Sequence, residues 1–422
     1  MSAPDPRAPP GCYEGDPELL PVAEAWRRIE AHVAPIGEHE EVALRAALGR
    51  VLARPVISPI DVPGHTNSAM DGYAVAASEL PDEGERRLRV LGTARAGSPF
   101  RGAVGAGETV RLMTGAVMPA GTDTVIMQEH ARVDGDDVII GTGHKPGQHV
   151  RARGEDIARQ SVVLEAGKRL MPAELGLLGS LGIAQVPVFR RLRVAFFSTG
   201  DELRSIGEPI AEGEVYDSNR YTLHAMLTRL GVEVMDMGVV RDDAGTIADA
   251  VSEAARVADV VVTSGGASTG EADYVREVLG KLGEVGFWRI AIRPGRPLAF
   301  GRIGEALFFG LPGNPVAVMV TFYRFVQPAL LRMSGEREAH PLPTVEAVST
   351  TRLRKKPGRM EVYRAILSRD AHGRLVVRST GKTGSGLLHT MSDANCFILL
   401  PEDRETVEPG TVVEVQPFFG LI

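Results

Sequence analysis

Acidic and glycine-rich loops follow four predicted strands and carry residue types that could hold a charged ligand. The loops are STGDEL (198–203), RDD (241–243), SGGASTGEADY (264–274) and GLPGNP (310–315). Ligands of an open parallel sheet bind beyond the carboxyl ends of its strands, so we expect the four loops to meet at one edge. Glu202, Asp242 and Asp273 supply carboxylate oxygens, which are the ligands that Mg²⁺ prefers. The alternative is that each carboxylate only caps the amino terminus of a helix.

Two groups of arginines could bind an oxyanion. Arg289 and Arg293 lie close together in FWRIAIRPGRP (287–297), and residues 351–364 hold six basic residues against one acidic residue, Glu361. A guanidinium group binds a phosphate or another tetrahedral oxyanion through two hydrogen bonds. For residues 351–364 taken alone, an exposed basic surface is the simpler interpretation. The loops and arginines together predict an enzyme that handles an anionic ligand with Mg²⁺.

Other motifs compete with this interpretation. Ser268 lies in a G-x-S-x-G pattern between a predicted strand and a predicted helix, as in serine hydrolases. That chemistry also needs an acid and then a histidine, and the later histidines, at 340, 372 and 389, fall outside the α/β section. The GKT string at 381–383 resembles a phosphate loop, but the glycine required five residues earlier is absent.

The section from 191 to 335 must position the four loops. Predicted strands at 192–198, 232–240, 259–264 and 307–310 alternate with predicted helices at 220–230, 244–257, 272–282 and 316–333. Apolar strands that alternate with amphipathic helices indicate a parallel sheet covered on both faces. We therefore expect a three-layer α/β domain at 191–335.

Smaller units flank this domain. Residues 1–16 are rich in proline and polar residues, which predicts a disordered tail. Helical periodicity predicts helices at 18–34, about 40–48 and 170–186, so 17–55 and 161–190 should form one discontinuous linking domain. Short β-branched runs between Gly and Pro turns predict a small β domain at 56–160 and a C-terminal β domain at 336–422.

Composition excludes several classes of protein. The chain has 422 residues, 44% of them hydrophobic, and a formal net charge of −7, which argues against a disordered chain and against a basic surface for nucleic acid. The cysteines, Cys12 and Cys396, are too few for a disulfide framework or a cysteine-built zinc site. The amino terminus lacks the apolar segment of a signal peptide, and no apolar run approaches the roughly 20 residues of a membrane helix. We expect a cytoplasmic protein with no nucleic-acid or membrane partner.

Eight strings then occur in order along the chain. They are DVPGHTNSAMDGYAV (61–75), MTGAVMP (113–119), RARGEDI (151–157), FSTGDEL (197–203), YDSNR (216–220), SGGASTGEADY (264–274), RPGRP (293–297) and LPGNPVA (311–317). Together they closely resemble the molybdopterin molybdenumtransferase family, whose relatives include the gephyrin E domain. The resemblance runs from about residue 18 to residue 420. It implies an elongated homodimer of multidomain α/β-plus-β subunits that converts adenylylated molybdopterin and molybdate, with Mg²⁺, into molybdenum cofactor and AMP.

The resemblance also implies roles for matching residues. Glu202, Asp242 and Asp273 correspond to the acidic centre that holds Mg²⁺ and cleaves the phosphoanhydride, and Asp71 and Thr114 to catalytic positions that the dimer brings towards the partner's α/β domain. The implied substrate-binding residues are Asp156, Asp201, Ser264, Gly265, Gly266, Ser268, Pro312, Gly313, Asn314 and Pro315. The implied molybdate-binding residues are Arg289, Arg293, Arg364 and Ser385. A molybdopterin adenylyltransferase would supply the substrate, and molybdoenzymes or carrier proteins would accept the product.

The chain departs from the family pattern at several positions and leaves alternatives open. Arginines 289, 293 and 296 stand where the family commonly has lysine, so the charge is kept while the hydrogen-bond geometry changes. Besides the transferase, a scaffold protein that binds the substrate without converting it and a serine hydrolase remain as hypotheses. Tungsten insertion is a further alternative, since tungstate and molybdate are tetrahedral dianions of similar size.

Overall fold

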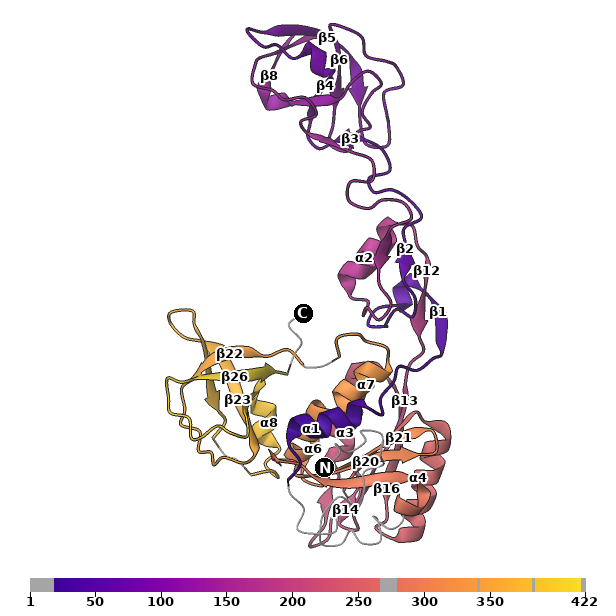
Figure 1. The fold of residues 1–422 in the computed structure, drawn as a ribbon, viewed down its shortest axis with the longest axis vertical. Coiled ribbons are helices and arrows are strands. Elements are labelled where there is room, and N and C mark those ends of the chain that lie inside the picture. Colours follow the sequence, from indigo (N-terminus) through magenta and orange to yellow (C-terminus); the bar gives the residue numbers. More distant parts are fainter. Residues whose placement is uncertain (1–18, 266–278, 340–341, 382–383, 419–422) are drawn as a thin grey trace, which may run out of the picture.

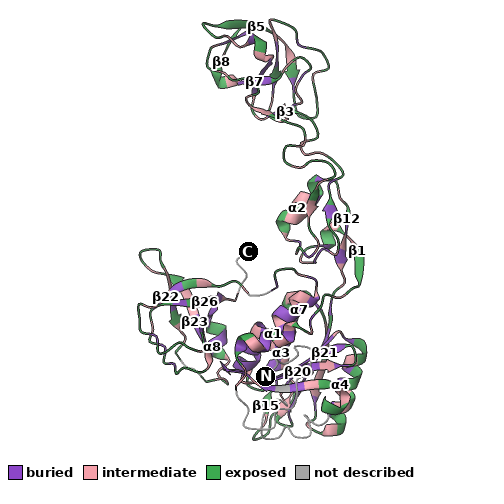
Figure 2. Ribbon diagram, viewed as in Figure 1, coloured by how far each residue is buried: buried purple, intermediate pink, exposed green. Residues whose placement is uncertain are grey.

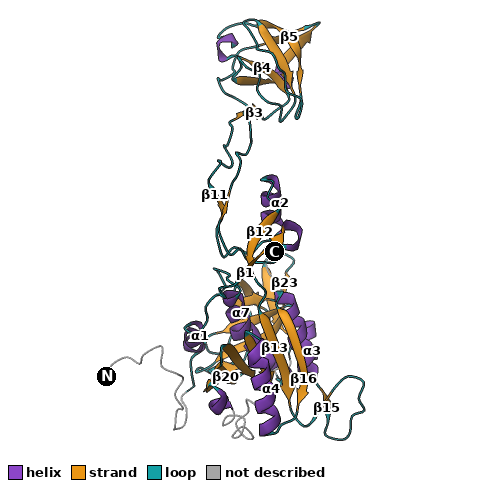
Figure 3. Ribbon diagram, turned by 90° about the vertical axis from the view of Figure 1, so that its right-hand side faces the viewer, coloured by secondary structure: helices purple, strands orange, loops and turns teal. Residues whose placement is uncertain are grey.

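The chain extends over several units arranged along its long axis (Figures 1 and 3). The structure is a computed structural model that describes residues 19–265, 279–339, 342–381 and 384–418. A small β domain stands at one end, a linking unit follows, and the α/β and C-terminal β domains lie together at the other end (Figure 1). The predicted disordered tail, 1–16, lies outside the described residues.

The small β domain contains a six-stranded sheet with the order β7-β4-β6-β5-β9-β8. Its elements are β3 (Asn67–Ser68), β4 (Gly72–Val75), η2 (Ala77–Glu79), β5 (Arg86–Ala94), β6 (Glu108–Leu112), β7 (Thr124–Met127), η3 (Gln128–His130), β8 (Ala131–Asp134), β9 (Asp137–Ile140) and β10 (Val150–Arg151). Alternate residues of β4 enter two separate cores: Ala74 packs in one, and Tyr73 and Val75 pack in the other. The β-branched runs predicted as strands are therefore strands, and β4, β7 and β9 are buried on both faces.

The linking unit consists of β1 (His39–Ala43), η1 (Leu44–Ala46), β2 (Val56–Ile57), β11 (Val162–Leu164), α2 (Pro172–Ser180) and β12 (Gln185–Phe189). The helix predicted at about 40–48 is wrong, because residues 39–43 form β1. Although this segment is rich in good helix formers, its backbone pairs with β12, His39 opposite Phe189 and Ala43 opposite Gln185. Tertiary pairing overrides local helix propensity here.

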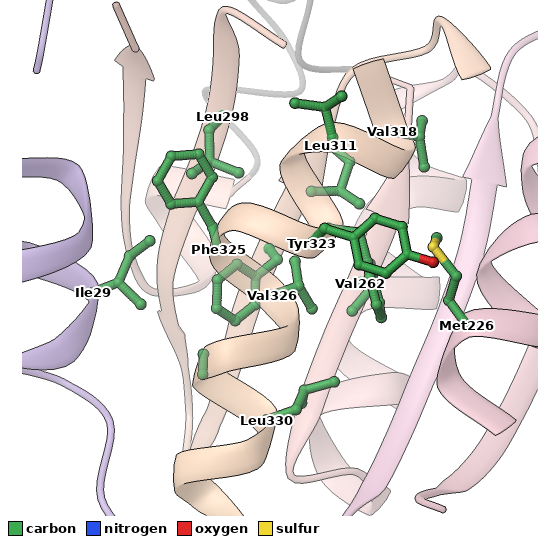
Figure 4. Close-up of a cluster of buried hydrophobic side chains, with 14 of the residues drawn as sticks. Ile29, Met226, Val262, Leu298, Leu311, Val318, Tyr323, Phe325, Val326 and Leu330 are labelled. Carbon is green, nitrogen blue, oxygen red and sulfur yellow. The ribbon is translucent and has the colours of Figure 1, made fainter. Parts of the chain in front are cut away.

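The first helix packs differently from its expected place beside α2. Helix α1 (Val22–Glu30) buries Val22, Trp26 and Ile29 in the core of the α/β domain. Figure 4 shows Ile29 facing side chains such as Phe325 and Leu298. Helix α2 instead packs in a separate core with β1, β2 and β12.

The α/β domain has a six-stranded sheet with the order β16-β13-β17-β21-β20-β18. Its elements are β13 (Arg193–Thr199), β14 (Leu203–Arg204), β15 (Val215–Tyr216), α3 (Ser218–Leu230), β16 (Glu233–Val240), α4 (Ala244–Val257), β17 (Val260–Ser264), β18 (Glu284–Arg289), β20 (Pro297–Ile303), β21 (Ala306–Leu311), α6 (Pro315–Thr321), η4 (Phe322–Val326) and α7 (Gln327–Met333). Strands β16, β13, β17 and β21 are parallel, as predicted, but β20 and β18 run antiparallel. A two-residue turn between Ile303 and Ala306 forces β20 and β21 into a hairpin, so the sheet is mixed.

Helices cover both faces of this sheet, which gives the three predicted layers. Phe196 and Val262 point to the face that α1, α3, α6 and α7 cover, whereas Phe197 and Val261 point to the face of α4. The buried colouring in Figure 2 follows the strands between these helix layers. Burial on both faces explains the unbroken apolar strand sequences.

The C-terminal β domain has the strand order β19-β23-β24-β22-β26-β25, and an additional β23–β25 pairing closes the sheet on itself. Its elements are β19 (Ile292–Arg293), β22 (Val345–Ser349), β23 (Met360–Arg369), β24 (Leu375–Ser379), α8 (His389–Asp393), β25 (Cys396–Leu400) and β26 (Val412–Pro417). Strand β19 belongs to the α/β section of the chain, so the two domains share one sheet. Within the described residues, no helix is both long and apolar enough to cross a membrane.

Candidate functional site

The carboxyl ends of three central strands meet at one edge of the α/β sheet. Ser198 of β13 lies opposite Ser264 of β17, and Ser264 lies opposite Leu311 of β21. The loops that begin at residues 200, 265 and 312 therefore start side by side. The structure brings together the described parts of these loops as the strand order requires.

Asn219, in the first turn of α3, joins two of these loops. Its side-chain amide donates hydrogen bonds to Ser264 Oγ at 2.8 Å and to the carbonyl oxygen of Gly313 at 2.7 Å. The side chain of Asp217 caps α3 by accepting from the N–H of Arg220 at 3.0 Å, which fixes the turn that presents Asn219. The amide of Asn219 thus ties the start of α3 to the end of β17 and to the loop that follows β21.

Gly265 allows the closest approach of backbone at this edge. Its φ is +95°, and a Cβ atom there would lie 2.4 Å from the carbonyl oxygen of Thr199. Any side chain would push β13 and β17 apart. Among the described residues, Ser198 Oγ, Thr199 Oγ1 and Asn219 Oδ1 are buried without a hydrogen-bond partner. Buried polar atoms of this kind normally have partners, so this edge can accept a polar ligand.

Carboxylates gather at the ends of β13 and β16. The N–H of Asp242 donates to Asp201 Oδ1 at 3.3 Å, which places the two aspartates together. The Glu202 side chain folds back over Gly200, where a Cβ atom would lie 2.7 Å from Glu202 Oε2. These carboxylates offer hard oxygen donors next to the Ser264 loop.

Part of the predicted site lies outside the described residues. Gly266, Ser268 and Asp273 belong to the stretch 266–278. Within the described residues, no group of three or more His, Cys, Asp or Glu side chains is arranged to hold a metal ion. Asp201 and Asp242, which lie together, and Glu202 beside them supply the carboxylate oxygens that Mg²⁺ prefers, and the ion keeps several water ligands.

A first cavity, of ≈ 490 Å³, opens between the RPGRP segment and the proline loop. Its lining residues are Ile292, Arg293, Pro294, Gly295, Arg296, Pro297, Pro312, Gly313, Asn314, Ala317, Arg359, Gly384 and Ser385. Gly295 has a φ of +106° and lies against Thr321 of α6, where a Cβ atom would approach Thr321 Cγ2 to 2.7 Å. The carbonyl oxygen of Ser385 accepts from the N–H of Val316 at 3.0 Å, which holds Ser385 at the start of α6.

Positive charge is concentrated around this first cavity. Burial, together with the nearby guanidinium groups of Arg359 and Arg289, lowers the pKa of Arg296 from its usual value. Arginines that lower each other's pKa repel one another, and an anion between them relieves that repulsion. Of the predicted oxyanion residues, Arg293 and Ser385 line this cavity and Arg289 lies close to Arg296.

A second cavity, of ≈ 620 Å³, shares Arg293 and Pro294 with the first. Its lining residues are Arg293, Pro294, Thr351, Arg352, Leu353, Arg354, Glu361, Val362, Tyr363, Arg364, Ser379 and Gly381. Burial lowers the pKa of Arg364, which is 4% exposed. The structure therefore places Arg364 and Ser385 in adjacent cavities, with Arg293 in both.

Asp71 and Thr114 lie together in the small β domain. Asp71 Oδ1 accepts hydrogen bonds from the N–H of Thr114 at 2.7 Å and from its hydroxyl at 2.8 Å. The hydrogen bond from the N–H of Thr114 is the main cause that lowers the pKa of Asp71, and the hydrogen bond from the Thr114 hydroxyl is the second. The carboxylate is therefore charged at neutral pH. Strands β4 and β6, which border this pair, stand at the opposite end of the chain from the α/β sheet (Figure 1). Asp156 is exposed, and its N–H donates to the carbonyl oxygen of Val62 at 3.1 Å.

Sequence patterns alone do not identify three residues of these surroundings as part of a site. Asn219 lies in the YDSNR string, and an asparagine in the first turn of a helix beside a strand end is a signal that could have identified it. Arg296 and Arg359 were visible as basic residues, but nothing in their spacing indicates that they face one cavity.

Comparison with known proteins agrees with this architecture. The chain matches three family models: "MoeA N-terminal region (domain I and II)" over residues 20–182, "Probable molybdopterin binding domain" over 195–332, and "MoeA C-terminal region (domain IV)" over 346–418. A solved structure of a molybdopterin biosynthesis moeA protein from Pyrococcus horikoshii aligns with a TM-score of 0.83 at 29% identity. It covers 95% of this chain and 100% of that one.

Relatives are similar over nearly the full length of the chain. A molybdopterin molybdenumtransferase of Haemophilus influenzae is 44% identical over 91% of this chain and 95% of its own length. A protein of the same name from Nostoc is 37% identical over 89% of this chain and 88% of its own length. Gephyrin from Dictyostelium discoideum is 31% identical over 94% of this chain and 62% of its own length. The chain therefore belongs to the molybdopterin molybdenumtransferase family.

Proposed function

We propose that this chain is a molybdopterin molybdenumtransferase. It transfers molybdenum from molybdate to adenylylated molybdopterin, and it releases AMP and molybdenum cofactor in a reaction that uses Mg²⁺. The observation that carries the proposal is the juxtaposition at the sheet edge. Carboxylates at the ends of β13 and β16 and arginines around Arg293 flank the loop that Asn219 holds.

The acidic loops are proposed to serve the phosphoanhydride of the substrate. Glu202 and Asp242, with Asp273, would hold Mg²⁺, and Asp201 would lie beside them. When bound, the ion neutralises charge on the phosphoanhydride oxygens during cleavage. Gly265 lets the loop after β17 lie against Thr199, at the end of β13, and Ser264, Gly266 and Ser268 would complete the loop that receives the phosphates.

The arginine-lined cavities are proposed to receive molybdate. A tetrahedral dianion needs positive charge and hydrogen-bond donors, and Arg293, Arg364 and Ser385 are the proposed ligands, supported by Arg289. Pro312, Gly313, Asn314 and Pro315 would form the wall between molybdate and the substrate, because Pro312, Gly313 and Asn314 line the first cavity and Asn219 grips Gly313.

A homodimer is part of the proposal. Asp71 and Thr114 form a charged, hydrogen-bonded pair remote from the α/β sheet of their own chain. Contact with the α/β domain of a second copy would bring this pair to the site, together with Asp156 from the segment between β10 and β11. The proposed partners are a molybdopterin adenylyltransferase that supplies the substrate and molybdoenzymes or carrier proteins that take the product, all in the cytoplasm.

AMP release from adenylylated molybdopterin with Mg²⁺, measured with and without molybdate, tests the proposal. Molybdate-dependent release of AMP together with molybdenum cofactor supports the transferase. Binding without any release favours the scaffold hypothesis, and release without molybdate indicates a plain hydrolase. Replacing molybdate with tungstate in the same assay tests tungsten insertion. Family membership argues against the serine hydrolase, for which Ser268→Ala would abolish activity.

A further inference from the structure

A buried carboxylate, Glu361, faces Arg293 in the second cavity. Strands β19 and β23 pair in parallel with Arg293 opposite Glu361, so their side chains leave the same face of the sheet. The Glu361 side chain is 10% exposed and the Arg293 side chain is 56% exposed. Arg293 Nη1 and Glu361 Oε1 are 3.7 Å apart. The carboxylate is therefore part of the wall, whereas the guanidinium group reaches the open space.

Tyr363 holds Glu361 in place. Its hydroxyl donates to Glu361 Oε2 at 2.9 Å from two residues further along β23, on the same face of the strand. Burial is the main cause that raises the pKa of the Tyr363 phenol above its usual value, and the hydrogen bond to Glu361 is the second. The hydroxyl thus stays protonated and remains a donor at neutral pH. The same hydroxyl also lies within hydrogen-bond distance of the carbonyl oxygen of Arg354, so this carbonyl and Glu361 share the one phenolic proton.

Arg293 is held more loosely than Arg190, an arginine with a firm carboxylate partner. Its distance to Glu361 exceeds that of a hydrogen bond, which is about 2.7–3.2 Å for N–H···O. By contrast, Arg190 donates to both carboxylate oxygens of Asp259 at 2.7 and 2.8 Å. An exposed, loosely paired guanidinium group can turn towards another anion at little cost.

We infer that Glu361 competes with the bound oxyanion for Arg293 and thereby sets the affinity of the site for tetrahedral dianions. The inference rests on the proposed function, because it concerns the same site. Four arginines line the second cavity, and Glu361 is the acidic residue among its described lining residues. Its negative charge occupies one guanidinium group and repels a dianion, so it lowers the affinity for molybdate and for sulfate alike.

Two substitutions with opposite expected effects test this role. Glu361→Gln removes the charge and keeps an oxygen that accepts from Tyr363, so the molybdate dissociation constant measured by calorimetry should fall about three- to tenfold. Tyr363→Phe removes one described partner of the carboxylate and leaves it freer to pair with Arg293, so the dissociation constant should rise about two- to threefold. A purely structural Glu361 would instead give weaker binding with both changes. Glu346→Gln, on an exposed position of β22, is the charge-matched control and should leave binding unchanged.

The effect of Glu361 on molybdate binding should depend on Arg293. In an Arg293→Ala background, which should itself weaken molybdate binding, Glu361→Gln should lose most of its effect, because the two residues act through one another. If the wild-type protein binds molybdate and Glu361→Gln does not bind it more tightly, this inference is overturned and the proposed function stays intact. Wild-type protein that neither binds molybdate nor releases AMP would overturn the proposed function itself.

Discussion

The side-chain amide of Asn219 donates to the carbonyl oxygen of Gly313 at 2.7 Å, across 94 positions of sequence. The same amide donates to Ser264 Oγ, so one side chain at the start of α3 holds the loops after β17 and β21 together. This bond connects the parallel sheet to the wall of the first cavity. It adds to the strand pairing that places the acidic loops and the arginines at one edge of the sheet.

Asn219→Ala should lower both activity and stability. It leaves buried polar groups of Ser264 and Gly313 without their donor, which costs about 1–3 kcal/mol. The rate of AMP release at saturating substrate should fall as well, because the loop after β21 loses its bond to α3. Urea unfolding followed by tryptophan fluorescence reports on this domain, since Trp26 and Trp288 both lie in its core. Thr222→Ala, which removes a hydroxyl bond to Ser218 within α3, is the control and should retain activity. Wild-type release by Asn219→Ala would contradict the positioning role.

The carboxylates at the strand ends should be needed for chemistry and not for folding. Asp242→Asn and Glu202→Gln should each slow AMP release about a hundredfold or more, because metal-assisted charge neutralisation contributes several kcal/mol to such reactions. Unfolding midpoints should stay close to the wild-type value. Asp249→Asn, on the exposed side of α4, is the matched control. Release at the wild-type rate by Asp242→Asn or Glu202→Gln would refute the acidic centre.

Removal of divalent metal should stop the reaction and leave the fold in place. We expect chelation by EDTA to abolish AMP release, and added Mg²⁺ to restore it, since carboxylate sites bind Mg²⁺ reversibly. In Glu202→Gln, restoration should need more Mg²⁺ than in the wild type. Undiminished release in EDTA, with metal content checked by elemental analysis, would count against a metal-dependent cleavage.

A site shared between two subunits should show complementation. A heterodimer of Asp71→Asn and Glu202→Gln subunits has one site with both residues intact, so it should regain about half of the wild-type activity. A heterodimer of wild-type and Asp71→Asn/Glu202→Gln subunits has a defect in each site and should be nearly inactive. The reverse ranking of the two heterodimers would mean that each site is built from a single chain.

The Arg190–Asp259 pair should stabilise the α/β domain in a pH-dependent way. Burial alone would raise the pKa of Asp259, but hydrogen bonds from Arg190 and from the N–H of Arg193 outweigh it, so the pKa lies below its usual value of 3.8. A lowered pKa in the folded state stabilises the protein above the unfolded-state pKa, and this stability is lost as the pH falls through the folded-state pKa. Asp259→Asn should cost about 1–3 kcal/mol at neutral pH, and the difference should shrink below pH 3.8. Urea unfolding followed by tryptophan fluorescence, at neutral pH and below pH 3.8, measures the difference in unfolding free energy between wild type and Asp259→Asn. An equal difference at the two pH values would exclude a stabilising effect of the Asp259 charge.

Local patterns in the sequence were enough to identify most elements of the fold. The apolar runs of β13 and β17 alternate with amphipathic helices, and such a pattern has few solutions other than a sheet with helices on both faces. The sequence motifs around Asp71, Glu202 and Asn314 were enough to identify the family. Local patterns failed at 39–43, where pairing with β12 defeats helix propensity, and at β18 and β20, whose direction is set by a hairpin.

By itself, the sequence determined which chemical groups are present: carboxylates after strands, arginines near residues 289–296 and 351–364, and the motifs of the family. Only the tertiary structure decided which of them meet. Arg293 lines two cavities, Arg359 joins Arg296 across 63 positions, and Glu361 becomes the counter-charge of Arg293 through the β19–β23 pairing. Side-chain type and strand periodicity are local properties of a chain, whereas the pairing of distant strands depends on how whole units pack, and no short stretch of sequence contains that information.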